Sequence, residues 1–206
     1  MSSSWVLPAV SERERLLRAT AELWRRDGYE GLSEAAICEC AGVGQESFER
    51  MFANVEEAAG AVIEVPLGAV VEVVGQQYSA DRSEAESYAR AIAGILELMA
   101  ANPDYAYVVY IAGRQMAPPE VHRGYESGHR FLVAMLERLW GSSSAAEQPA
   151  RAGLGALGAA EALVRREIAG GRFERLPELA PECVFAATVP FLGQREALRL
   201  AKSVAT

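Results

Sequence analysis

Cysteine and histidine are scarce in this sequence, and their scarcity excludes several kinds of site. The 206 residues include three cysteines and two histidines. Three cysteines are too few for a disulfide framework, and Cys38 and Cys40 would point to opposite sides of a predicted helix, so we expect reduced, structural thiols. His122, Glu126 and His129 share one helix face and could hold a metal, but no cysteine or further histidine accompanies them. We therefore expect partly exposed histidines and no metal.

Catalytic signatures are also missing. The sequence contains no glycine-rich phosphate loop, no nucleophile elbow, and no HExxH or CxxC motif. Carboxylate pairs such as Glu56-Glu57 are more simply explained as charges that the helix dipole favours at a helix N-terminus. We therefore expect a binding protein rather than an enzyme, without a cofactor.

Long hydrophobic runs are missing as well. The N-terminal MSSSWVLPAV has no basic region and too short an apolar run for a signal peptide, and Glu64, Pro66 and Glu72 interrupt the most apolar segment. Half of all residues are nevertheless hydrophobic, so a sizeable core can form. We expect a soluble, cytoplasmic protein with a flexible N-terminus over residues 1–10.

Positive charge is in short supply. Twenty basic residues oppose 28 acidic ones, giving a net charge of −8. This balance argues against a protein that coats nucleic acid non-specifically, although a local basic face could still exist.

What the sequence does contain is helical periodicity. No segment alternates with the period of two that strands require, whereas 3.6-residue patterns recur along nearly the whole length, so the sequence predicts an all-α fold. The first helix would start after Ser11, which has Glu14 in capping-box spacing, and would end at Gly28. Its apolar stripe consists of Leu16, Thr20, Leu23 and Trp24.

Two short helices on either side of a glycine turn follow. Ser33 can cap a helix over residues 34–41, and Gly42-Val43-Gly44 turns the chain into a second short helix over residues 45–52. This layout is that of a helix-turn-helix, whose second helix enters the major groove of DNA.

The second short helix has an apolar and a polar face. Phe48 and Phe52 are one turn apart and would pack inward. Their expected partners are Leu16, Leu23 and Ile37, and the residues left outside are Gln45, Glu46, Glu49 and Arg50. Asn54 and Glu57 then repeat the capping-box spacing and start a longer helix. The remaining predicted helices cover residues 83–101, 104–116, 119–140, 148–169 and 180–203.

In this order of helices the chain resembles the TetR family of one-component transcriptional regulators. The matching positions are Gly28-Tyr29, Ser33, Ile37, Ala41-Gly42-Val43, Phe48, Phe52 and Asn54-Val55-Glu56-Glu57. The resemblance implies an N-terminal three-helix DNA-binding domain with the helix-turn-helix over residues 11–62, and a helical ligand-binding and dimerisation domain over residues 63–206. It also implies a regulator, most often a repressor, that binds double-stranded operator DNA as a dimer and is released by a small-molecule effector.

The chain departs from the family where DNA contacts are expected. Gly44, Gln45, Glu46 and Glu49 replace residues that are commonly hydroxylated, basic, small or aromatic in the family, and Val55 replaces a common lysine. Residues 11–62 contain six arginines and eleven acidic residues, a net charge of −5. The candidate DNA-binding residues are Arg13, Ser33, Gly44, Gln45, Glu46, Ser47, Glu49 and Arg50.

Two interpretations of these carboxylates remain open. A glutamate can accept a hydrogen bond from cytosine N4, and arginines, the Ser33 hydroxyl and backbone N–H groups can hold phosphates, which favours retained and specific DNA binding. Alternatively, the chain is a TetR-like ligand- or protein-binding module whose acidic DNA-binding domain is degenerate, because each missing phosphate contact removes part of the electrostatic affinity.

The second half suggests a ligand pocket and a dimer interface. Aromatic, methionine and polar residues gather in one stretch, as in a small-molecule cavity or equally a helical core. The candidate ligand-binding residues are Tyr107, Tyr110, Arg114, Met116, His122, Tyr125 and His129. Gly153, Gly155 and Gly158 would let another helix approach closely, which favours a homodimer through residues of about 148–203 over an ordinary intramolecular contact. The final helix offers Val184, Phe185, Val189, Phe191 and Leu192 as contacts for this interface.

Overall fold

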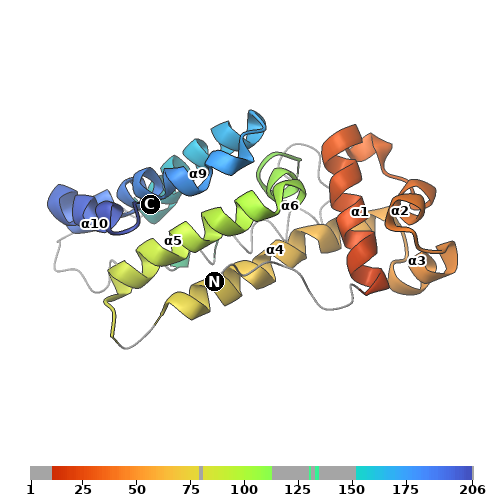
Figure 1. The fold of residues 1–206 in the computed structure, drawn as a ribbon, viewed down its shortest axis with the longest axis horizontal. Helices are drawn as coiled ribbons and strands as arrows, with labels where there is room; N and C mark the ends of the chain where they lie inside the picture. Colours follow the sequence, from red (N-terminus) through yellow and green to blue (C-terminus); the bar gives the residue numbers. More distant parts are fainter. Residues whose placement is uncertain (1–10, 79–80, 113–129, 131–132, 135–151, 206) are drawn as a thin grey trace. The chain divides into compact units, whose positions relative to one another are not determined.

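The computed structural model describes residues 11–78, 81–112, 130, 133–134 and 152–205, and all regular structure among them is helical (Figure 1). The all-α prediction is therefore confirmed. The chain divides into two compact units, one formed by Met1–Leu67 with Ala101–Tyr125 and the other by Gly68–Ala100 with Glu126–Thr206. Each unit is described by itself below.

The first unit contains the helix-turn-helix. Its helices are α1 (Glu12–Asp27), α2 (Glu34–Ala41), α3 (Gln45–Met51), the first part of α4 (Val55–Gln77), and α6 (Pro103–Tyr107), which continues as a π-helical turn over Val108–Ala112. A 3-10 turn, Tyr29–Gly31, joins α1 to α2. The short helices α2 and α3 lie beside α1 at the red and orange end of the ribbon (Figure 1).

Local side-chain contacts fix where these helices start. The Ser11 hydroxyl accepts the Glu14 N–H at 3.2 Å, and the Glu14 carboxylate accepts the Ser11 N–H at 2.8 Å. The hydroxyl of Ser33 accepts the N–H of Ala36 at 3.2 Å. A helix whose first N–H groups are capped in this way begins at a defined residue, so the predicted starts of α1 and α2 are confirmed.

Glycine fixes the end of α2. Gly42 lies in the left-handed region with φ 60°, and the N–H of Val43 donates to the carbonyl of Cys38 at 3.0 Å. This is the hydrogen-bond pattern of a Schellman motif, in which a residue without Cβ reverses the chain at least cost. The turn between α2 and α3 is therefore short and well defined.

The apolar face of α3 is anchored in the core of the first unit. Phe48 and Phe52 are 1% and 3% exposed and pack with the α1 stripe and Ile37, as the sequence predicts. From α4, Ala58, Ala59, Val62 and Ile63 enter the same core. Burying these side chains holds the opposite, polar face of α3 in solvent.

Among the described residues, only α4 has the length and apolar composition of a membrane-spanning helix. Its first turns lie in the core of the first unit, where Ala58, Ala59 and Val62 are fully buried. Core helices of globular proteins share these properties, so length and composition alone do not distinguish the two roles.

The second unit is built from the rest of α4, α5 (Glu84–Ala101), α9 (Ala152–Ala169) and α10 (Ala180–Ser203), with 3-10 turns at Phe173–Arg175 and Pro177–Leu179. The helices α9 and α10 run side by side at the blue end of the ribbon (Figure 1). The predicted helices over 83–101, 148–169 and 180–203 correspond to α5, α9 and α10. The predicted helix over 104–116 begins as α6, but residues 113–116 and nearly all of 119–140 lie outside the described residues.

The last helix is not continuous. Gly193 has φ 74° and ψ 165°, which is not helical, and Pro190 lies just before it. Because proline has no N–H to donate and glycine tolerates positive φ, the two residues together separate α10 into two segments. The predicted bounds of 180–203 are those of α10, and the interruption at Gly193 was not predicted.

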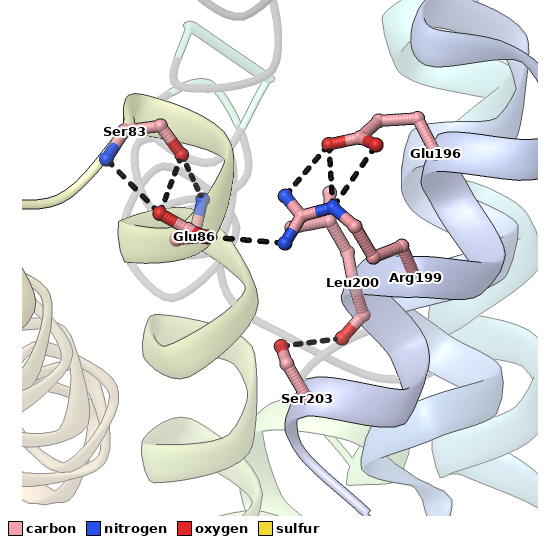
Figure 2. Close-up of polar contacts among 6 residues, drawn as sticks. All are labelled: Ser83, Glu86, Glu196, Arg199, Leu200 and Ser203. Carbon is pink, nitrogen blue, oxygen red and sulfur yellow. Dashed lines mark hydrogen bonds and ion pairs between the residues drawn. The ribbon is translucent and has the colours of Figure 1, made fainter.

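An ion-pair cluster joins α5 to the second segment of α10 (Figure 2). Arg199 contacts Glu196 at 2.7 Å on its own helix and Glu86 at 3.1 Å on α5. Glu86 also accepts the Ser83 N–H at 3.2 Å, and its own N–H donates to the Ser83 hydroxyl. Glu86 therefore takes part both in the capping box at the start of α5 and in the contact between α5 and α10.

Most apolar residues suggested for a dimer interface on the final helix serve the chain's own core instead. Val184 and Phe191 are 0% and 2% exposed, and Phe185 and Leu192 pack against the cluster that contains Val184. The cluster that contains Val184 also includes Ala89 of α5, with Ala85 and Ile92 packed against it, so α5 contributes to this core. Expecting Val184 and Phe191 as intermolecular contacts is therefore wrong, while Phe185 and Leu192 are only partly buried.

Candidate nucleic-acid interface

The exposed face of α3 collects most of the candidate DNA-binding residues. Gln45, Glu46, Glu49 and Arg50 are exposed, and Ser47 is half-buried. Gly44 is the N-cap of α3 and provides no side-chain hydrogen bond there. Side chains three or four residues apart share one face of a helix, so α3 presents a single polar surface.

Arg50 supplies the positive charge of that surface, and its side chain already forms polar contacts within the chain. Its Nη2 lies 3.1 Å from Glu12 Oε2, on the first turn of α1, and 3.0 Å from the Ser47 hydroxyl. A DNA acceptor that uses Nη2 must therefore displace one of these two acceptors, while the guanidinium carries further N–H donors.

Arg13 lies at the C-terminal end of the same helix. Its guanidinium carbon is 5.5 Å from the centroid of the Phe52 ring, within the range of a cation–π contact. Phe52 is the C-cap of α3, and its ring in turn lies 5.6 Å from that of Phe48. Both candidate cations therefore lie at α3: Arg50 belongs to this helix, and Arg13 lies over the ring of its C-cap residue.

The carboxylates of α3 differ in their contacts. Gln45 Nε2 donates to Glu49 Oε1 at 3.4 Å, so Gln45 orients this carboxylate. The side chain of Glu46 forms no hydrogen bond or ion pair with the rest of the described chain. Both are acceptors, and the major groove offers matching donors at cytosine N4 and adenine N6.

Sequence reasoning missed Arg15. Its Nη1 donates to the carbonyl oxygens of Gly42 at 3.1 Å and Ala41 at 3.4 Å, so α1 holds the end of α2 and the turn. These acceptors are 26 and 27 residues away in the sequence, and no local pattern marks such a contact. Arg15 therefore helps to hold the turn of the helix-turn-helix in place.

The other arginines of the first unit are also engaged. Arg25 pairs with Asp104 and Arg26 with Asp27, while Arg18 interacts within the chain. None of the six arginines in residues 11–62 is therefore without a partner, although the exposed pairs are weak enough to exchange.

Of the candidate ligand-binding residues, the structure describes only Tyr107 and Tyr110. Tyr107 and Tyr110 are half-buried in α6 and the π-helical turn, a kind of irregularity that often occurs at functional sites. Arg114, Met116, His122, Tyr125 and His129 lie outside the described residues. The described part of the chain contains no cluster of three or more histidine, cysteine or acidic side chains placed to hold a metal.

The second unit contains a buried polar group that the sequence did not reveal. Ser87 is 1% exposed, and its hydroxyl has no hydrogen-bond partner among the described residues. The neighbouring Tyr88 is also buried, and burial raises the pKa of its hydroxyl. Burial likewise raises the pKa of the Cys183 thiol to about 12. An unsatisfied buried hydroxyl destabilises a fold, so Ser87 is a candidate contact for a polar group of a ligand.

The arrangement of helices is that of a known class. The chain has the fold of the TetR-family transcriptional regulators, several of which match it over most of its length. No family model and no curated protein matches the sequence.

Three solved structures illustrate the likeness. The fatty acid degradation regulator FadR from Bacillus halodurans is 16% identical, with a TM-score of 0.74 over 88% of this chain and 99% of its own. FadR from Bacillus subtilis, in complex with stearoyl-CoA, is 17% identical, with a TM-score of 0.72 over 87% and 97%. PfmR from Thermus thermophilus is 21% identical, with a TM-score of 0.64 over 88% and 96%. At these identities the likeness establishes the fold.

Proposed function

We propose that this protein is a dimeric, ligand-responsive transcriptional regulator, acting as a repressor in the cytoplasm, and that α3 reads its operator DNA. The observation that carries this proposal is the exposed polar face of α3, held outward by Phe48 and Phe52 in the core. A recognition helix needs this arrangement, because its base-reading side chains must reach the major groove while its apolar face stays buried.

The direct test is a gel-shift or fluorescence titration against the DNA upstream of the protein's own gene and its neighbours, over a series of salt concentrations. Arg50→Ala should weaken specific binding by about 1–3 kcal/mol if Arg50 contacts a base edge. The matched control is Arg26→Ala, which removes an equal charge from an exposed residue paired with the adjacent Asp27. Equal effects of the two substitutions would remove Arg50 from the interface.

The second candidate function is a ligand- or protein-binding module with a degenerate DNA-binding domain. Its support is the excess of acidic residues together with the engagement of every arginine of residues 11–62. The double variant Glu46→Gln with Glu49→Gln separates the alternatives. Uniformly tighter binding to all sequences indicates carboxylates that only repel DNA, whereas loss of preference at one base pair indicates a glutamate that reads cytosine. A double variant that binds no DNA at low salt favours the degenerate domain.

The proposed dimer interface lies on the exposed parts of α9 and α10. Leu154 on α9 is 46% exposed and Leu198 on α10 is 41% exposed, although both are large and apolar. Gly155 and Gly158 have open space above their Cα atoms. A second copy could cover these positions by close helix packing.

The proposed effector is a small molecule with a long apolar part. The support is the similar FadR fold with stearoyl-CoA bound, together with the apolar interior of the second unit and the unpaired Ser87 hydroxyl. Stearoyl-CoA should raise the melting temperature and release DNA, whereas coenzyme A alone should do neither. If stearoyl-CoA shifts neither quantity, this class of effector is wrong, while DNA binding is tested independently.

A further inference from the structure

Arg50 is isolated as a cation. It is the only lysine or arginine between Arg26 and Arg82, so α2, the turn, α3 and the whole of α4 contain no other basic residue. Any attraction that these helices exert on a phosphate through a side-chain charge must therefore come from Arg50.

The contact that occupies Arg50 comes from outside the helix-turn-helix. Glu12 lies on α1, 38 residues earlier in the sequence, and its Oε2 is 3.1 Å from Arg50 Nη2. The side chains are 62% exposed for Arg50 and 42% exposed for Glu12. An ion pair this exposed is open to water, and an incoming anion can displace the carboxylate.

Arg13, which follows Glu12 in the sequence, is also close to α3. Arg13 lies over the Phe52 ring at the C-terminal end of α3, so it is a second cation beside this helix. Glu12 is adjacent to Arg13 in the chain and in contact with Arg50. Its carboxylate reduces the positive charge at the place where the charge would attract DNA most effectively.

We propose that Glu12 sets the DNA affinity of this protein by competing, as an intramolecular anion, with the DNA phosphates or bases for Arg50. The proposal rests on the DNA-binding function proposed above. Glu12 holds Nη2 of the guanidinium and offsets its charge, so a DNA acceptor that uses this nitrogen must displace the carboxylate. After the exchange Glu12 loses its counter-charge near a polyanion, which further weakens the complex.

The size of the effect follows from the exposure of the pair. Exposed ion pairs typically change an equilibrium constant by roughly two- to fivefold, so Glu12→Gln should tighten DNA binding by about that factor. Salt dependence should change as well. When wild-type Arg50 leaves Glu12, the carboxylate takes up a cation from solution, which offsets part of the cation release from DNA. Glu12→Gln should therefore steepen the fall of affinity with salt.

The experiment uses the full-length protein and one operator fragment, with a salt series for each variant. The matched control is Glu39→Gln on α2, because Glu39 is exposed, changes the net charge equally, and its side chain has no partner in the described part of the chain. Glu12→Gln is also measured in an Arg50→Ala background. Circular dichroism verifies that each variant keeps its helices.

The proposal expects Glu12→Gln to tighten binding more than Glu39→Gln, and expects this advantage to vanish when Arg50 is alanine. Equal effects of the two glutamine variants would show a general charge effect and overturn the role of Glu12, while DNA binding would stand. An advantage that persists without Arg50 would overturn it as well. If neither wild type nor any variant binds DNA at low salt, the proposed function itself fails.

Discussion

At the scale of single residues, Arg15 is an example of a side chain whose importance lies in its distant acceptors. It donates to two carbonyl oxygens at the end of α2, including that of Gly42 at 3.1 Å. Arg15→Ala should lower the free energy of unfolding by about 1–2 kcal/mol, because charged donors form the stronger hydrogen bonds but this one is partly exposed. Arg15→Lys, which keeps a charged donor, should lose less in urea denaturation. Equal losses would assign the effect to the alkyl chain.

A second residue-scale prediction concerns Glu167, which is 3% exposed between α9 and the turn that follows. Hydrogen bonds from Arg172, then Arg166, lower its pKa to about 2 from an ordinary value of 4.5, with Arg175 also nearby. A carboxyl with a lowered folded pKa contributes stability above the unfolded pKa and loses it as the pH falls. The wild type should therefore lose stability between about pH 4.5 and pH 2.

The control for this prediction is Glu167→Gln, which cannot titrate. Urea midpoints of the two proteins should differ most near neutral pH and converge towards about pH 2, since the protonated wild type resembles the amide. A difference that stays constant with pH would mean that the arginines do not stabilise the ionised form.

At the scale of helices, Gly193 and Gly68 make opposite predictions for the same substitution. Gly193 has φ 74° and ψ 165°, a conformation that L-residues rarely adopt, so Gly193→Ala should destabilise by about 1–3 kcal/mol. Gly68 is an exposed helical residue of α4 with open space around an added Cβ, so Gly68→Ala should stabilise by about 0.5–1 kcal/mol. Thermal unfolding of both variants checks the sign of each change. A tolerated alanine at 193 would show that the interruption of α10 can relax.

The helices also show what the sequence could predict. Starts and ends determined by residues within one turn, such as Ser11 with Glu14 or Gly42, were predictable because the cause is local. The break at Gly193 was not, because proline and glycine also occur in continuous helices and tertiary packing decides the outcome.

The candidate site also combines features with a local cause, which the sequence predicts, and contacts that depend on tertiary packing, which it does not. The outward face of α3 could be predicted from the spacing of Phe48 and Phe52. The contacts of Arg50 with Glu12 and of Arg15 with Gly42 could not, since each joins residues that only the packed fold brings together.

At the scale of the whole molecule, dimerisation would compensate for weak DNA binding by a single helix-turn-helix. The two helix-turn-helix units of a dimer can bind two half-sites of one operator, so the second contact becomes intramolecular. An effector that binds more tightly to one spacing of the two helix-turn-helix units than to another will then change DNA binding.

The dimer is tested by Gly155→Leu with Gly158→Leu. An added Cβ at either position meets nothing within 4 Å among the described residues, so we expect the single chain to accommodate the change, and circular dichroism verifies that the variant keeps its helices. Sedimentation should show a monomer, and DNA affinity should fall by about 100-fold or more. A variant that remains dimeric places the interface elsewhere. A folded monomer with unchanged affinity contradicts the two-headed mechanism.

The capped helix starts have a consequence for how the chain folds. Ser11 with Glu14, Asn54 with Glu57, and Ser83 with Glu86 each join residues three apart, so these contacts can form before any distant part of the chain arrives. Proteins dominated by such short loops fold faster than those that must first close long ones. The ends of α1, α4 and α5 that carry these motifs are therefore expected to be ordered early, and mutations there should slow folding more than they accelerate unfolding.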